Sequence, residues 1–139
     1  MPTPYTQIVR EMKSRYALRI RRWRGNMSGS AWQVRYSDGR TVNWIEAPYP
    51  RTPVSLAIFL HEVGHHAIGF DRYDAGCEEE YHVWTWALEQ MRRFGVEPDA
   101  RVQRRFDRSM QYAVGKALRR GLGRHDLPEP LHQFIPRAA

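Results

Sequence analysis

The first apolar pattern along the chain has the period of a helix. After Pro4, the residues Ile8, Met12 and Tyr16 are spaced four positions apart. Side chains at this spacing lie on one face of an α-helix, and polar residues fill most of the positions between them. We therefore predict an amphipathic N-terminal helix that begins near Pro4.

Three segments with the pattern of strands follow. Apolar and polar residues alternate over residues 18–23 and again over residues 32–36, which is the period of a half-buried strand. The dipeptide Asp38-Gly39 is a strong hairpin signal, and residues 41–46, TVNWIE, continue with β-branched and aromatic residues. These segments predict a small three-stranded antiparallel sheet.

Helical patterns return after the proline-rich segment APYPRTPVS. Thr52 and Pro53 are residue types favoured at an N-cap and in the first turn of a helix. We expect a helix to begin there and to include HEVGHH, residues 61–66. A second helix is expected over residues 78–95, and a third, rich in arginine, over about 98–120.

Together these elements predict an α+β fold. Its order is an N-terminal helix, a small three-stranded antiparallel sheet, the HEVGHH helix, a glutamate-bearing helix and an extra basic C-terminal helix. A chain of 139 residues has the length of one compact domain. We assign residues 1–125 to a single domain and expect residues 126–139, which contain three prolines, to form an irregular C-terminal tail.

Composition limits the partners and the compartment. Apolar residues make up 42% of the chain, but no apolar run approaches the roughly 20 residues of a membrane-spanning helix, so we expect no membrane partner. The N-terminus lacks the features of a signal peptide and Cys77 is the single cysteine, which favours a cytoplasmic location. The net charge of +7 is compatible with nucleic acid binding through the basic C-terminal helix, although a solvated surface is the commoner explanation.

The chemistry of the chain is concentrated in His61, Glu62 and His65, which form the pattern H-E-x-x-H. Residues four apart on a helix lie one above the other, so both imidazoles can bind one metal ion, for which zinc is the usual choice. Glu62 is about 100° round the helix from His61, and its carboxylate can act there as a general base. His66, about 140° from His61, is expected to be exposed.

A catalytic zinc site has three protein ligands, so a third is expected elsewhere. Glu78, Glu79 and Glu80 open the next helix, and at about 100° per residue Glu80 points in the direction of that helix's apolar face. A buried carboxylate needs a partner or a metal, so Glu80 is the first choice and Glu79 the second, whereas Glu78 should face solvent. Weaker alternatives are Asp71, at a metzincin-like spacing, and His82, as in SprT-like proteases.

The motif HEVGHH on one helix, with E-x-x-x-W near the start of the next, resembles the compact gluzincin-type zinc peptidases. The ImmA/IrrE-type metallopeptidases and the minigluzincins have similar patterns over about residues 5–95, although Tyr81 stands where these families usually have a small residue. The resemblance implies zinc ligation by His61, His65 and Glu80, with the motif's glutamate as the base. It also implies that the strand TVNWIE lines the cleft and binds substrate by strand addition.

The sequence therefore predicts a zinc-dependent metallopeptidase that hydrolyses peptide bonds of a protein or peptide substrate. Water activated by the metal is the nucleophile and Glu62 is the general base. The alternatives are a non-catalytic zinc-containing module, a basic nucleic-acid-binding module, and a DNA-associated protease resembling SprT-like repair enzymes or mobile-element antirestriction proteins. A tail lying in the cleft as a pseudo-substrate, through His132 and Phe134, is a further hypothesis. A second group is expected to stabilise the oxyanion that forms during hydrolysis, and the candidates for it are Tyr73, Tyr112, His125 and His132.

Overall fold

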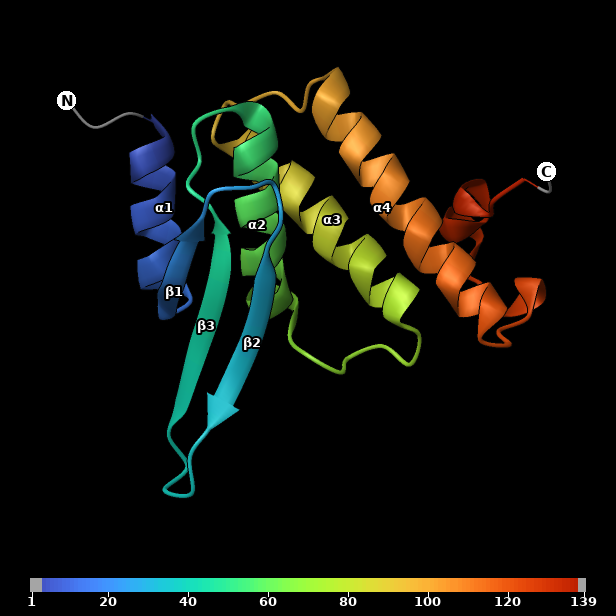
Figure 1. Cartoon of the computed structure of the whole chain (residues 1–139), viewed down its shortest axis with the longest axis horizontal. Coiled ribbons are helices and arrows are strands. Elements are labelled where there is room, and N and C mark those ends of the chain that lie inside the picture. The colour runs from blue at the N-terminus through green and yellow to red at the C-terminus, as the bar shows by residue number, and fades with distance from the viewer. Residues whose placement is uncertain (1–3, 138–139) are drawn as a thin grey trace.

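The computed structural model describes residues 4–137 and confirms the α+β class and the predicted order of helices and strands (Figure 1). The elements are α1 (Pro4–Arg15), β1 (Leu18–Arg24), β2 (Ser30–Arg35), β3 (Thr41–Pro48), α2 (Pro53–Ile68), α3 (Gly76–Arg93), α4 (Ala100–Arg119) and two short 3₁₀-helices, η1 (Arg124–Asp126) and η2 (Glu129–Phe134). The sheet lies against α2, and α3 and α4 follow on the side away from α1 (Figure 1). Within the described residues, no helix has the length and hydropathy of a membrane span.

The sheet is mixed, so the prediction of an antiparallel sheet is wrong for one strand. The strand order is β1-β3-β2, with β2 antiparallel to β3 and β1 parallel to it. The turn at Gly39, whose φ of 88° suits glycine, joins β2 to β3 as a hairpin. Residues 25–29 instead connect β1 to β2 past the end of β3, so β1 and β2 lie at opposite edges of the sheet. Alternation of side chains is the same in parallel and antiparallel strands, so it could not reveal this crossing.

The central position of β3 also corrects the expectation that TVNWIE receives a substrate strand. Residues 18–24 of β1 pair with one edge of β3, and residues 30–35 of β2 pair with the other. Both edges of β3 are therefore occupied by backbone hydrogen bonds within the sheet. Among the described strands, only β1 and β2 have an edge on which another strand could be added.

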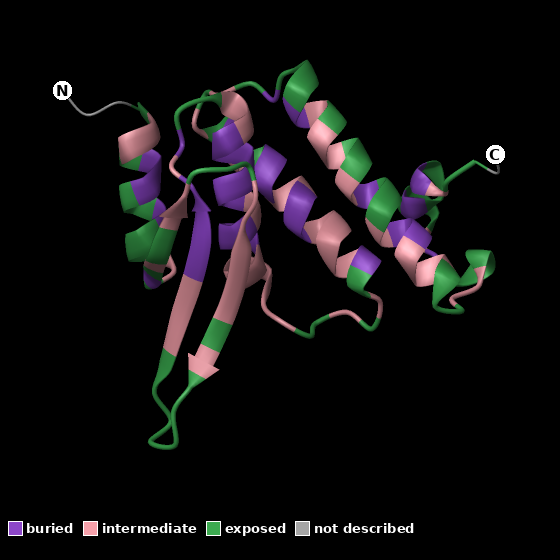
Figure 2. Cartoon of the chain, viewed as in Figure 1, coloured by how far each residue is buried: buried purple, intermediate pink, exposed green. Residues whose placement is uncertain are grey.

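The core lies between the sheet and α2 and continues into α3. Ile45 and Ala47 of β3, and Phe59 and Leu60 of α2, are all 0% exposed. Figure 2 shows buried residues along β3, α2 and α3, while the outer sides of α1 and α4 are largely exposed. Because α2 is enclosed by the sheet and α3, polar side chains that point from α2 toward α3 lie in a confined space.

The start of α2 agrees with the prediction, and hydrogen bonds at its N-cap fix the conformation of its first turn. Thr52 is the N-cap, and its hydroxyl accepts a hydrogen bond from the backbone N–H of Ser55. The hydroxyl of Ser55 in turn accepts from the backbone N–H of Thr52 at 2.9 Å. This reciprocal cap fixes the first turn, and Pro53 supplies the restricted φ that suits it.

The C-terminal tail is not irregular, which corrects another prediction. Residues 124–126 and 129–134 form 3₁₀-helices, and Leu127, Leu131 and Phe134 are buried. Prolines exclude a regular α-helix but allow short 3₁₀ turns, whose apolar side chains can still pack. The ring of Phe134 contacts Phe106 of α4, so this side chain belongs to the core rather than to an extended segment in a cleft.

Candidate metal centre

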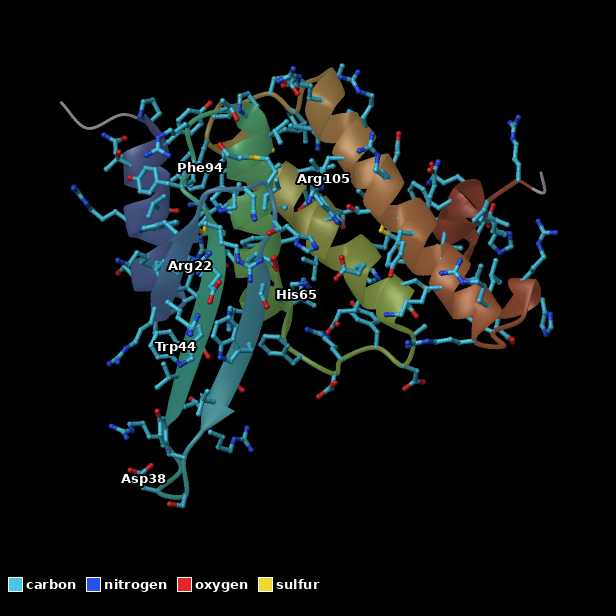
Figure 3. All side chains as sticks on the ribbon, in the orientation of Figure 1. Arg22, Asp38, Trp44, His65, Phe94 and Arg105 are labelled. Carbon is cyan, nitrogen blue, oxygen red and sulfur yellow. The ribbon has the colours of Figure 1, made fainter. Side chains whose placement is uncertain are left out.

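The structure brings His61 and His65 of α2 together with Glu80 of α3. The Nε2 atom of His61 lies 2.8 Å from Oε2 of Glu80, and Nε2 of His65 lies 3.1 Å from Oε1. One nitrogen or oxygen from each residue lies within 4.8 Å of the others, close enough to hold a metal ion. His65 is labelled in Figure 3, where it lies near α3. The two histidines are one helical turn apart, and α3 crosses α2 where the carboxylate can reach both.

The three residues could hold a metal ion, and zinc is one ion whose bond lengths can be compared with the site. Zn–N and Zn–O bonds of about 2.0–2.1 Å in a tetrahedral arrangement place neighbouring ligand atoms about 3.3 Å apart. The observed separations of 2.8 and 3.1 Å from the two oxygens of Glu80 are close to this value, and one ligand atom from each residue lies within 4.8 Å of the others. Two imidazole nitrogens and one carboxylate oxygen are a common set for catalytic zinc, and they leave a fourth position for water or substrate.

In the absence of metal, hydrogen bonds and opposite charges hold His61 and His65 close to Glu80. Burial lowers the pKa of His61, but hydrogen bonds and charge interactions with Glu62 and Glu80 outweigh it and raise the pKa to about 9. Burial raises the pKa of Glu80, whereas the hydrogen bonds with His61 and His65 lower it, and the net result lies well below the ordinary value. At neutral pH the site is thus a half-buried imidazolium–carboxylate pair, in which a metal ion would replace a proton.

Glu62 lies on the opposite side of His61 from Glu80. Its side chain is buried, at 5% exposure, and its Oε1 is 3.5 Å from Nδ1 of His61. The two ring nitrogens of this histidine therefore face two different carboxylates. Such an arrangement, with one nitrogen toward the metal position and the other toward a carboxylate, is typical of histidines that bind zinc.

Gly29, in the loop between β1 and β2, provides the space that Glu62 occupies. A Cβ atom at this position would lie 2.7 Å from both Cγ and Oε2 of Glu62, closer than nonbonded atoms normally approach. No sequence pattern pointed to Gly29, because it lies 33 positions before Glu62 in the chain. Its role is apparent only from the fold.

The other candidate ligands are not part of this cluster. Glu79 lies beside Glu80, and its Oε1 is buried without a hydrogen-bond partner among the described residues. His82 stacks on Tyr73 with the ring centroids 4.5 Å apart, and Asp71 is exposed.

His66 is not exposed, which corrects the prediction for this residue. It is half-buried, and its Nε2 lies 3.0 Å from the carbonyl oxygen of Trp44 on β3. Burial lowers its pKa. The side of α2 that carries His66 faces the sheet, and this could not be seen from the position of the residue on the helix alone.

The candidates for oxyanion stabilisation are mostly engaged elsewhere. Tyr73 stacks on His82, Nε2 of His132 lies 2.9 Å from the carbonyl oxygen of Leu127, and His125 is exposed. Tyr112 lines a cavity that Glu80 also lines. Of the four candidates, Tyr112 is therefore the one that lines a cavity together with a residue of the metal centre.

Comparison of the chain with protein-family models, with curated proteins and with solved structures gave no significant match in any of the three. The function proposed for this chain therefore comes from its own residues and their geometry.

Proposed function

We propose that the chain is a zinc-dependent metallopeptidase in which His61, His65 and Glu80 bind the metal and Glu62 is the general base. The convergence of two Nε2 atoms on the two oxygens of Glu80, at 2.8 and 3.1 Å, is the observation that carries the proposal. Glu62 supports it, because it is a buried carboxylate in contact with His61, one of the proposed ligands, and a carboxylate close to a metal-bound water can act as a general base.

In the proposed reaction, each of these residues has a separate role. Zinc, when bound, acts as a Lewis acid toward the substrate carbonyl and acidifies water. The carboxylate of Glu62 accepts the water proton and then delivers it to the amide nitrogen of the leaving group, so that it acts first as base and then as acid. Gly29 leaves the room that the Glu62 carboxylate needs. His61 is oriented by its contact with Glu62 through Nδ1.

The substrate backbone is expected to pair with β2 instead of β3. The strand β2 has a free edge, and Gly29, which directly precedes Ser30 at its start, contacts Glu62. An extended peptide added to this edge would run past the metal centre, and backbone hydrogen bonds would hold it with little dependence on its sequence.

Metal content and proteolysis together test the proposal. We expect one zinc per chain in the wild type, in Glu62→Gln and in Glu79→Ala, and loss of zinc in His65→Ala and Glu80→Ala, by elemental analysis. Glu79→Ala is the matched control, because it removes the neighbouring carboxylate of the same helical turn. Zinc-loaded wild type should cut members of a proteome-derived peptide library, detected by mass spectrometry, and Glu62→Gln should cut them about 10²–10⁴-fold more slowly. Absence of bound zinc, or equal cleavage by Glu62→Gln, would overturn the proposal.

A second candidate function is a non-catalytic metal site. It is favoured by one observation, the 3.5 Å approach of Glu62 Oε1 to Nδ1 of His61, because a carboxylate in this contact can orient the ligand without taking part in proton transfer. In that case Glu62→Gln should lower zinc affinity by about 10–100-fold, and the wild type should cut no peptide. A general base predicts the reverse, with zinc affinity kept and cleavage lost.

A further inference from the structure

A large cavity adjoins the metal centre on the side of α4. Its volume is about 1030 Å³, and Glu79 and Glu80 of α3 form part of its wall. Pockets for small ligands have volumes of about 300–1,000 Å³, so this one can admit a segment of several residues. Glu80 belongs both to this wall and to the metal centre, so the cavity adjoins the metal centre at this residue.

The opposite wall of the cavity is cationic. It contains Arg105, Arg108 and Lys116 of α4 and its C-cap residue Arg120, whose spacing places them along one side of the helix. Figure 3 shows Arg105 projecting from α4 toward α3. Among the ion pairs of residues 4–137, none includes any of these cations. The four positive side chains thus line the cavity without an ion pair to a carboxylate, and Arg105 also donates a hydrogen bond to the carbonyl oxygen of Met27 at 2.8 Å.

The start of α3 adds positive potential to the same cavity. Ala75, Gly76 and Cys77 line it, and Ala75, the N-cap of α3, makes no side-chain hydrogen bond to the first turn. The N–H groups at the start of a helix carry a partial positive charge and favour anions. The helix end and the four cations therefore act in the same direction.

On the basis of the proposed function, we propose that this cavity binds a carboxylate-rich segment of the peptide substrate next to the bond that is cut. The preference would be for aspartate or glutamate side chains, or for the carboxylate at the end of a peptide. Tyr112, which is 67% exposed and lines the cavity, can donate a further hydrogen bond to such a group.

A peptide fits the cavity better than a nucleic acid strand does. Besides the cations, the wall contains Asp74 and Glu79, and Oε1 of Glu79 is buried without a hydrogen-bond partner among residues 4–137. The buried Oε1 of Glu79 needs a donor. A peptide supplies backbone N–H donors together with acidic side chains, whereas a phosphodiester backbone offers only acceptors.

Binding of short labelled peptides to zinc-loaded Glu62→Gln protein tests the proposal without requiring cleavage. Fluorescence anisotropy compares an amidated peptide containing Asp-Glu-Asp, the same peptide with Asn-Gln-Asn, and the neutral peptide with a free C-terminal carboxylate. We expect the Asp-Glu-Asp peptide to bind at least about tenfold more tightly than its neutral counterpart, as several ion contacts with the cavity wall would give. Tighter binding of the third peptide instead would assign the site to the chain terminus.

Charge reversals on α4 locate the site. The double variant Arg108→Glu and Lys116→Glu should abolish the preference for the acidic peptide. The matched control, Arg104→Glu and Arg119→Glu, changes the net charge equally but lies outside the cavity wall, and it should retain the preference. Melting temperatures of both variants check that they are folded. Equal loss in both variants, or no preference in the parent protein, would overturn the inference.

The failure of this inference can be distinguished from the failure of the proposed function. Cleavage of acidic and neutral peptides at equal rates by the wild type would refute the inference and leave the peptidase intact. A different outcome is selective binding of the acidic peptide that the α4 double variant abolishes, with no cleavage of any peptide by the wild type. This result would support the proposed ligand class of the cavity and refute the proposed peptidase function. An oligonucleotide that displaces the acidic peptide at lower concentration than the unlabelled peptide would overturn the inference in favour of nucleic acid.

Discussion

Replacement of Gly29 by alanine tests how the loop between β1 and β2 admits the buried carboxylate of Glu62. The backbone of Gly29 does not have a positive φ, so alanine brings no backbone strain. The added methyl group would instead lie 2.7 Å from Cγ and from Oε2 of Glu62. The effect of the substitution should therefore come from contact with this one side chain.

The distances set the size of the effect. Nonbonded carbon atoms approach each other to about 3.5–4.0 Å, so the overlap is about 1 Å. Relief of such overpacking, by a rotamer change of Glu62 or a shift of the loop, costs about 1–3 kcal/mol. For a chain of this length the melting temperature should fall by roughly 3–10 °C. Displacement of the carboxylate by about 1 Å should also slow cleavage about 10²-fold.

Urea denaturation of four proteins measures the effect without a substrate. These are the wild type, Gly29→Ala, Glu62→Ala and the double variant. The atoms that clash are absent in Glu62→Ala, so Gly29→Ala should cost little in that background and the coupling free energy should be about 1–3 kcal/mol. Gly25→Ala is the control, because Gly25 lies in the same loop with no atom within 4 Å of the added carbon.

Two results would refute this reasoning. One is a free energy of unfolding for Gly29→Ala equal to that of Gly25→Ala. The other is the same loss of stability from Gly29→Ala whether or not Glu62 is present. In either case, the close approach of the loop to the carboxylate would have no energetic consequence.

Three further predictions concern the metal-free site, the N-cap of α2 and the tail. Because the folded-state pKa of His61 is raised from 6.5 to about 9, its contribution to the stability of the metal-free protein is present below about pH 6.5 and lost as pH rises through about 9. Urea denaturation across this range should show that loss, and a constant or rising metal-free stability would contradict it. Thr52→Ala should cost about 1 kcal/mol with zinc content unchanged, and a loss of zinc would show that the cap also positions the histidines. Phe134→Ala should cost about 3–5 kcal/mol, whereas a stability equal to wild type would show that the tail does not belong to the core.

Local patterns were sufficient to predict the helices, the strands and much of the candidate site. The positions of His61 and His65 on one helix face, and the direction of Glu80 on the next helix, depend only on the geometry of a helix and on which of its sides is apolar. Thr52 and Pro53 similarly act within a single turn. Each of these features is determined by residues that are close together in the sequence, so spacing was enough to predict it.

The errors concern contacts between distant residues. The direction of β1 relative to β3 depends on the path of residues 25–29. Parallel and antiparallel strands have the same alternation of side chains, so the alternation does not reveal this direction. His66 resembles an exposed residue until the sheet is placed against α2. The tail resembles an irregular segment until Phe134 is placed against Phe106. In each case the missing information was a packing partner from another part of the chain.

By itself, the sequence determined which elements form and which helix faces carry two imidazoles and a carboxylate, because helical and strand periods are local properties of the backbone. Only the tertiary structure decided that β3 is central, that Gly29 makes room for Glu62, and that a cationic wall of α4 faces Glu80 across a cavity. These features depend on how the elements pack. Packing is set by the summed burial of side chains from the whole chain, and no short motif contains that information.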